Sequence, residues 1–346
     1  MHETVATHNF TGCEWKVSYI SSFLEKTWLD NFNSLSYADR QNSRTGANSS
    51  ETTVRDLLTT RFIPSTWKAC ALLNNQHKDI SEWLKIKYSV MTPVKDAADV
   101  RLGSLSHHLF RKECDSDEAF LLPIEPLSGA LRHPFSFCKP NPEYIYDTNH
   151  VLSWNIHLGK NPSFKKFDRA LFVYVGGAAT PSNKRSANKL DAILSKYRDI
   201  QIEFDEVHVW QAVLFPLDRY LSHIRAHSMT YFAYHNITVP CDRTDVFYQG
   251  LWESMLANSR KDDFIVVFMD VCGTSRKHAF LEHLLQNSFQ ASLIDELYFT
   301  DHHTGSPFTT MELGQATDRN KSRTLIDNYK LLKRIRDAGV RAHAWI

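Results

Sequence analysis

Short apolar runs and amphipathic segments alternate along the chain, and the pattern is clearest after residue 165. Apolar runs predict β-strands at 170–175, 206–211, 229–236, 263–271, 295–303 and 340–346. The segments between them predict helices at 182–199, 216–227, 245–257, 276–289 and 322–338, the last ended by Gly339. Strands that alternate with helices predict an α/β fold, a doubly wound and mostly parallel sheet with helices on both faces.

The first 150 residues show weaker patterns and are expected to form an N-terminal extension to a Rossmann-like domain at 151–346. Residues 15–32 are weakly amphipathic and predict a helix, as do residues near 78–88. The Ser/Asn-rich segment 40–53 predicts a mobile loop. Five prolines within 123–142 exclude a long helix there.

Composition limits the classes of partner. Apolar residues make up 42% of the chain, enough for a core, and the formal net charge of +1 gives no electrostatic case for nucleic acid binding. No apolar run approaches the length of a membrane span, and the first residues do not resemble a secretion signal. The six cysteines are scattered, as expected for free thiols in a reducing compartment, so we expect a cytoplasmic protein.

In a parallel sheet, ligands bind beyond the carboxyl ends of the strands, so the residues at those ends are candidate site residues. The first four predicted strands nominate Gly176, Gly177, Ala178, Gln211, His235, Asn236 and Asp270. Small residues after the first strand would let a ligand approach free backbone N–H groups, although they are equally explained by a tight turn. The full dinucleotide fingerprint is absent, so a nicotinamide or flavin enzyme is poorly supported.

Three ionisable residues are candidates for catalysis. Asp270 ends a nearly pure apolar run and is expected to meet a ligand, although it could also cap the helix that follows. His302 and His303 end the fifth predicted strand, where one imidazole could act as a base. Asp270 with these histidines could also bind a metal, but further ligands are not evident, and we expect no metal site.

Several short motifs resemble the eukaryotic and algal branch of the FkbM-like methyltransferases. The motifs are ALFVYVGGAAT, FDEVHVWQ, YHNITVP, VVFMDVCGT, LIDELYFTDHH and IRDAGVRAHAWI. Within them, the residues that fit well are Asp295, Glu296, His302, His303, Gly339, Arg341, His343 and Trp345. Residues 124–134, IEPLSGALRHP, are similar to a segment that precedes the catalytic core in the same branch.

The resemblance implies a class I methyltransferase fold that binds S-adenosylmethionine and methylates an oxygen of a small molecule or sugar. It also implies that Gln211 stands where a carboxylate usually holds the ribose, and that Tyr174 and Val175 stand where an acid usually precedes the glycine turn. These departures leave a second interpretation open, a non-catalytic or repurposed Rossmann-like binding domain. A metal-dependent hydrolase using Asp270 and the two histidines is a third.

Overall fold

The structure is a computed structural model. It describes residues 6–10, 13–22, 25, 88–89, 92–94, 105–112, 119–125, 127, 151–154, 167–176, 184–211, 231–236, 250, 253, 255, 259–260, 262–270, 274–300 and 325–345. The loop expected at 40–53 and the helix expected at 216–227 lie outside these residues. Of the helix expected near 78–88, only Tyr88 is described, and it begins a short strand.

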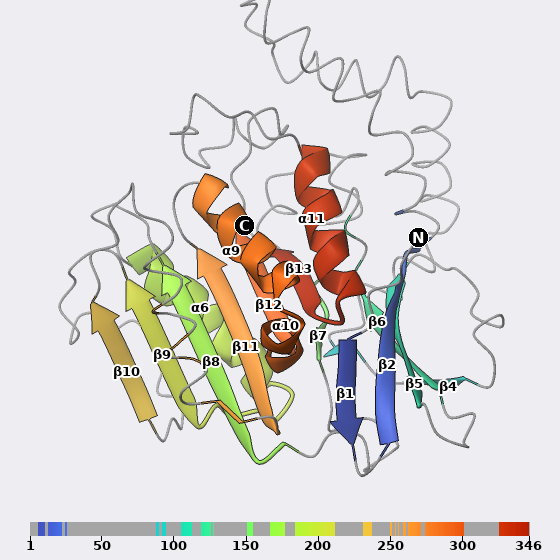
Figure 1. The fold of residues 1–346 in the computed structure, drawn as a ribbon. Coiled ribbons are helices and arrows are strands. Elements are labelled where there is room, and N and C mark those ends of the chain that lie inside the picture. Colours follow the sequence, from blue (N-terminus) through green and yellow to red (C-terminus); the bar gives the residue numbers. More distant parts are fainter. Residues whose placement is uncertain are drawn as a thin grey trace, which may run out of the picture.

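Six parallel strands form the central sheet (Figure 1). They are β8 (Arg169–Gly176), β9 (Glu206–Gln211), β10 (Tyr231–Asn236), β11 (Asp263–Asp270), β12 (Glu296–Thr300) and β13 (Arg341–Trp345). Their order is β10-β9-β8-β11-β12-β13, and every neighbouring pair is parallel. The predicted α/β class with a parallel sheet is therefore confirmed, and each strand overlaps its predicted range.

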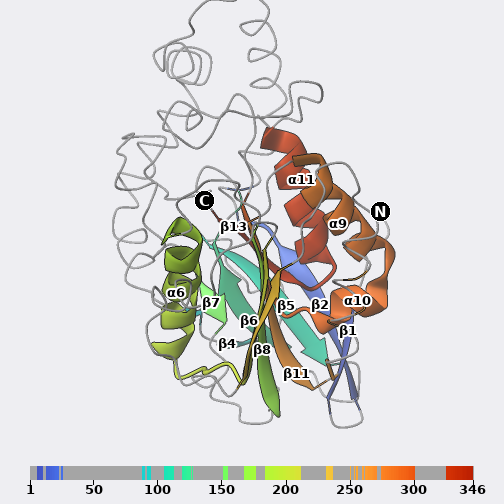
Figure 2. The same cartoon turned by 90° about the vertical axis from the view of Figure 1, so that its left-hand side faces the viewer.

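Helices cover both faces of this sheet (Figure 2). Helix α6 (Lys184–Arg198) lies on one face, and α9 (Thr274–Gln286), α10 (Ser288–Leu293) and α11 (Leu325–Asp337) lie on the other. Alternate residues of a buried strand face opposite sides, so β8 and β11 supply both cores. Phe172 and Val266 pack in the core that contains Leu190 of α6, whereas Val173 and Val267 pack in the core that contains Leu281 and Leu332. No helix among the described residues is long and apolar enough to cross a membrane.

Two helix ends follow from single residues. The segment 276–289, predicted as one helix, is divided at Asn287, whose side chain accepts a hydrogen bond from the N–H of Gln290 at 3.1 Å and so begins α10. Helix α11 ends as predicted, because Gly339 has a φ of 91°, which glycine adopts without a Cβ clash.

An antiparallel sheet of five strands lies in the N-terminal part, in the order β1-β2-β5-β6-β4. Its strands are β1 (Ala6–Phe10), β2 (Cys13–Ile20), β4 (Thr92–Val94), β5 (Ser106–Lys112) and β6 (Ala119–Ile124). Two short strands, β3 (Tyr88–Ser89) and β7 (Ser153–Trp154), pair in parallel. The helix predicted from residue 15 is wrong through Ile20, because β2 pairs on both sides, with β1 and β5, and buries Val17.

Candidate functional site

Four strand ends lie in one row at the carboxyl edge of the parallel sheet. Asp270 pairs with Gly176, Gly176 with Gln211, and Gln211 with Asn236. The strands following β8 in the chain extend the sheet in one direction as far as β10, whereas β11 lies on the other side of β8. The order of the strands therefore reverses between β8 and β11, which is the position where open α/β sheets bind ligands.

Tyr174 contacts two members of this row, Asp270 and Gly176, at the point where the strand order reverses. Its hydroxyl donates a hydrogen bond to Asp270 Oδ2 at 3.3 Å, and its ring stacks on Phe268 with the centroids 5.3 Å apart. A Cβ added to Gly176 would lie 2.5 Å from Cε1 of the Tyr174 ring. Tyr174 is fully buried and Asp270 is 6% exposed. The glycine at 176 is thus required by the close approach of this tyrosine, a reason that the sequence did not reveal.

Several predicted site residues are described only in part or not at all. Gly177, Ala178, His302 and His303 lie outside the described residues. Gln211 and Asn236 are described as strand residues in the row, but their side chains lie outside the description. The structure therefore brings together Gly176, Gln211, Asn236 and Asp270 by backbone register, and the other four positions stay predictions.

His235 belongs to a cluster that the sequence analysis missed. Its Nε2 lies 3.2 Å from Nδ1 of His208, and His208 Nε2 lies 3.1 Å from Glu206 Oε2. The His235 ring stacks on Trp210 at 4.2 Å. Burial lowers the pKa of His235, and the neighbouring His208 lowers it further, so both effects favour the neutral imidazole. The alternation in EVHVWQ was a usable signal, since it places Glu206, His208 and Trp210 on one face.

The Glu206 carboxylate continues this cluster toward the amino ends of the strands. Arg169 Nη1 donates to Glu206 Oε1 at 2.6 Å, and Arg169 Nη2 donates to Asp263 Oδ2 at 2.7 Å. A cavity of about 10 Å³ lies beside His208 and Trp210 and is also lined by Ser259. That is the space of roughly one water molecule, so the cavity is far too small for a nucleoside.

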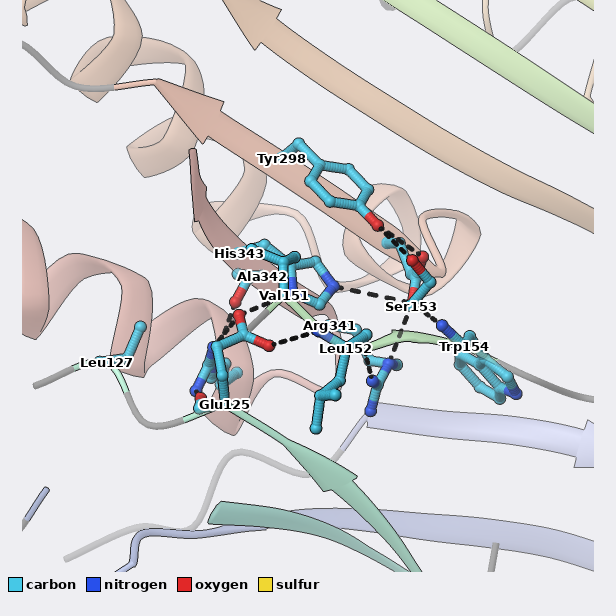
Figure 3. Close-up of polar contacts among 12 residues, drawn as sticks. Glu125, Leu127, Val151, Leu152, Ser153, Trp154, Tyr298, Arg341, Ala342 and His343 are labelled. Atoms are coloured by element: carbon cyan, nitrogen blue, oxygen red, sulfur yellow. Dashed lines mark hydrogen bonds and ion pairs between the residues drawn. The ribbon is translucent and has the colours of Figure 1, made fainter. Parts of the chain in front are cut away.

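A second polar cluster is fully buried between the two sheets (Figure 3). Glu125, at the end of β6, accepts hydrogen bonds at Oε1 from Arg336 Nη2 at 3.2 Å and, at Oε2, from the N–H of Leu152 at 3.1 Å. Nδ1 of His343 lies 2.8 Å from the same Oε1. Burial alone would raise the pKa of Glu125, but His343 and Arg336 outweigh it and hold the pKa at about 2. Glu125 is therefore an ionised carboxylate in the interior.

Arg341 supplies the second ion pair of this cluster. Its Nε donates to Glu296 Oε1 at 3.1 Å, and its Nη2 donates to the carbonyl of Leu152 at 2.7 Å. Asp295 accepts the N–H of Ile265 at 2.8 Å. Glu296, Arg341 and His343 thus connect the parallel sheet to residues 125–154, and Gly339 ends helix α11. Trp345 is a strand residue whose side chain is not described.

Four stacked rings on neighbouring strands lie between the carboxyl-edge residue Asp270 and the buried cluster around Glu125. Tyr174, Phe268, Tyr298 and His343 lie on β8, β11, β12 and β13, with successive centroid separations of 5.3, 6.0 and 4.6 Å. The hydroxyl of Tyr298 lies 3.2 Å from Ser153 Oγ and 3.1 Å from the hydroxyl of Tyr197. We refer to these four rings as the aromatic row; it runs from Asp270 to the buried cluster around Glu125.

Searches for similar proteins assign no family. No protein-family model matches the chain, and no curated protein or solved structure is significantly similar to it. Within the described part of the chain, no group of three or more His, Cys, Asp or Glu side chains is arranged to hold a metal ion.

Proposed function

We propose that this chain is an S-adenosylmethionine-dependent O-methyltransferase of the FkbM-like type, acting on a small molecule or a sugar. One observation carries the proposal: Asp270, Gly176, Gln211 and Asn236 lie side by side at the carboxyl edge, across the point where the strand order reverses. The motifs that resemble the FkbM-like branch supply the choice of ligand.

Methyl transfer to an oxygen requires that the two substrates be held in line and that a group accept the proton of the hydroxyl. S-adenosylmethionine supplies an electrophilic methyl carbon on a sulfonium, and an acceptor oxygen that loses its proton can displace the sulfur. At the carboxyl edge, Asp270 and the predicted residues His302 and His303 are the candidates for receiving that proton. The row of strand ends at the carboxyl edge would hold the ligand near these groups. Residue 211 is the position expected to bind the ribose.

Calorimetry with S-adenosylmethionine tests the proposal directly. We expect a micromolar dissociation constant, corresponding to about −7 to −8 kcal/mol. Gln211→Glu should tighten binding by roughly tenfold, because a carboxylate makes stronger hydrogen bonds to ribose hydroxyls than an amide does. Gln201→Glu is the matched control, since Gln201 is exposed and precedes β9 at its amino end. Equal affinities for the two variants would argue against this pose.

A non-catalytic binding domain is the second candidate, and one observation favours it. The ring of Tyr174 fills the space over Gly176, on one face of the sheet at the end of β8. A ligand must therefore lie beyond this ring or toward the opposite face. Absence of both heat and thermal stabilisation at millimolar S-adenosylmethionine would favour this second function over the first.

A further inference from the structure

Three polar side chains, Glu206, His208 and His235, follow one another across strands β9 and β10 toward the carboxyl edge, and we refer to them as the relay. The pairing of these strands places all three on the face of the sheet opposite to Tyr174. His208 is buried, whereas His235 is half-buried and directly precedes Asn236 of the row at that edge. The relay therefore ends at an imidazole that is partly open to solvent.

The hydrogen bonds of the relay allow one arrangement of protons when both rings are neutral. A carboxylate only accepts, so Nε2 of His208, which lies 3.1 Å from Glu206 Oε2, must carry the proton. His208 then has its lone pair on Nδ1, and His235 Nε2 donates to it across 3.2 Å. The two rings are tilted by 9° with their centroids 5.5 Å apart, so these nitrogens meet head-on in the plane of the rings, as a hydrogen bond requires. The lone pair of His235 is therefore on Nδ1.

We propose that His235 accepts the proton of a ligand's hydroxyl group at Nδ1, and that Glu206 and His208 are positioning residues that fix its tautomer. Within the part of the chain that the structure describes, this Nδ1 has no hydrogen-bond partner. Burial and the neighbouring His208 lower the pKa of His235, which favours the neutral form that can accept a proton. The inference goes beyond the proposed function, because it requires no S-adenosylmethionine and applies to any hydroxyl-bearing ligand on this face.

The relay also stabilises the ring once it has received a proton. A proton on Nδ1 makes His235 a cation, and this strengthens the hydrogen bond from its Nε2 to His208 and, in turn, the one from His208 to Glu206. The His235 ring lies on the indole of Trp210 at 4.2 Å, a contact that favours a cation. Arg169 Nη1 holds the other carboxylate oxygen of Glu206 at 2.6 Å and keeps the carboxylate in place.

Glu206→Gln should reverse the direction of every hydrogen bond in the relay. Arg169 keeps the amide oxygen of the glutamine, so the amide N–H group faces His208 and donates to its Nε2. His208 must then donate from Nδ1, and the proton of His235 moves to its own Nδ1. Long-range ¹H–¹⁵N NMR spectra of the histidine-labelled protein, recorded where both rings are neutral, should show this change of tautomer. Glu203→Gln is the matched control, because Glu203 is exposed and precedes β9.

Acylation by diethyl pyrocarbonate measures whether the lone pair on Nδ1 is available. The nitrogen attacks a carbonyl carbon of the reagent, ethyl carbonate leaves, and the ring then loses its Nε2 proton to solvent. Peptide mass spectrometry should find His235 acylated in wild type, and Glu206→Gln should slow this reaction by about tenfold, because freeing Nδ1 then breaks a hydrogen bond to His208. His208→Asn cuts the relay, so adding Glu206→Gln to that variant should change the rate by less than about twofold.

Neither measurement uses S-adenosylmethionine, so the inference stands or falls independently of the proposed function. A wild-type His235 that carries its proton on Nδ1, or that the reagent does not acylate, would refute the proton-accepting role. Equal tautomers and rates in Glu206→Gln and Glu203→Gln would refute the positioning roles. If Glu206→Gln unfolds, the wild-type spectra decide: a ¹⁵N–¹⁵N coupling between His208 Nδ1 and His235 Nε2 is expected across their hydrogen bond, and its absence would overturn the relay.

Discussion

Replacing Arg336 with methionine removes a cation from the interior and leaves its partners behind. The guanidinium is fully buried and donates to the carbonyl of Glu125 at 2.7 Å, to Glu125 Oε1 at 3.2 Å, to the hydroxyl of Tyr19 at 2.9 Å and to the carbonyl of Ala342 at 2.8 Å. Methionine keeps an unbranched apolar stem, is shorter than arginine and cannot donate any of these hydrogen bonds. Glu125 would remain 3% exposed, with Nδ1 of His343 2.8 Å from its Oε1.

The expected loss is large on the scale of protein stability. Removing one partner of a buried ion pair typically costs about 3–5 kcal/mol, because the other charge stays desolvated. Most domains have about 5–15 kcal/mol in total. With an m value of about 3 kcal/mol per molar urea, the unfolding midpoint should fall by at least about 1 M.

Urea unfolding followed by tryptophan fluorescence and circular dichroism measures this change, and helix α11 provides the control. Arg334 forms an exposed pair with Glu282 at 3.0 Å, so Arg334→Met should change stability by less than about 1 kcal/mol. The double variant Glu125→Gln with Arg336→Met should recover part of the loss, since residue 125 then carries no charge that needs the guanidinium. If the midpoints of Arg336→Met and Arg334→Met coincide, the buried cluster does not stabilise the fold as argued.

Three further predictions follow from other contacts. Gly176→Ala should destabilise the protein by about 1–3 kcal/mol, because the new methyl group would collide with Tyr174; a thermal melt unchanged from wild type would contradict the packing over this glycine. The pKa of Glu125, held at about 2, lies below that of an unfolded carboxyl, so its stabilisation is present above about pH 4.5 and is lost as the pH falls toward 2. Glu125→Gln should therefore reduce the loss of stability at low pH, measured by unfolding curves between pH 7 and 2. His235 should titrate below 6.5 in an NMR titration, and His208→Gln should move its pKa part of the way back, because burial remains; a wild-type pKa above 6.5 would contradict the cluster geometry.

The parallel sheet could be predicted because each of its strands carries a local signal. DFIVVFMD is too continuously apolar for anything but a buried segment, and every residue of β11 is buried. The carboxyl-edge row was also predictable in outline, because parallel strands bring their carboxyl ends together. The hydrogen bond from Tyr174 to Asp270 was not, since it depends on the register of two strands that are 96 residues apart in the chain.

The N-terminal sheet was less visible because its local signals conflict with its structure. Residues 15–20 have spacings that fit a helix as well as a strand, and pairing with β5 decides between them. The prolines from Pro123 onward excluded a long helix but did not predict a strand, and Pro123 lies in β6 opposite His107. The strand β4 pairs with β6 only as far as Leu121, so within the described residues the proline lies beyond the paired part of that side of β6.

The buried cluster around Glu125 also has a consequence for folding during translation. Glu125 leaves the ribosome long before its partners, since Arg336 follows it by 211 residues and His343 by 218. Until then the nascent N-terminal sheet holds a carboxylate that must stay hydrated or be shielded by chaperones. We therefore expect folding to be completed only after α11 and β13 have emerged, and a deletion that removes β13 would leave Glu125 without its contact to His343.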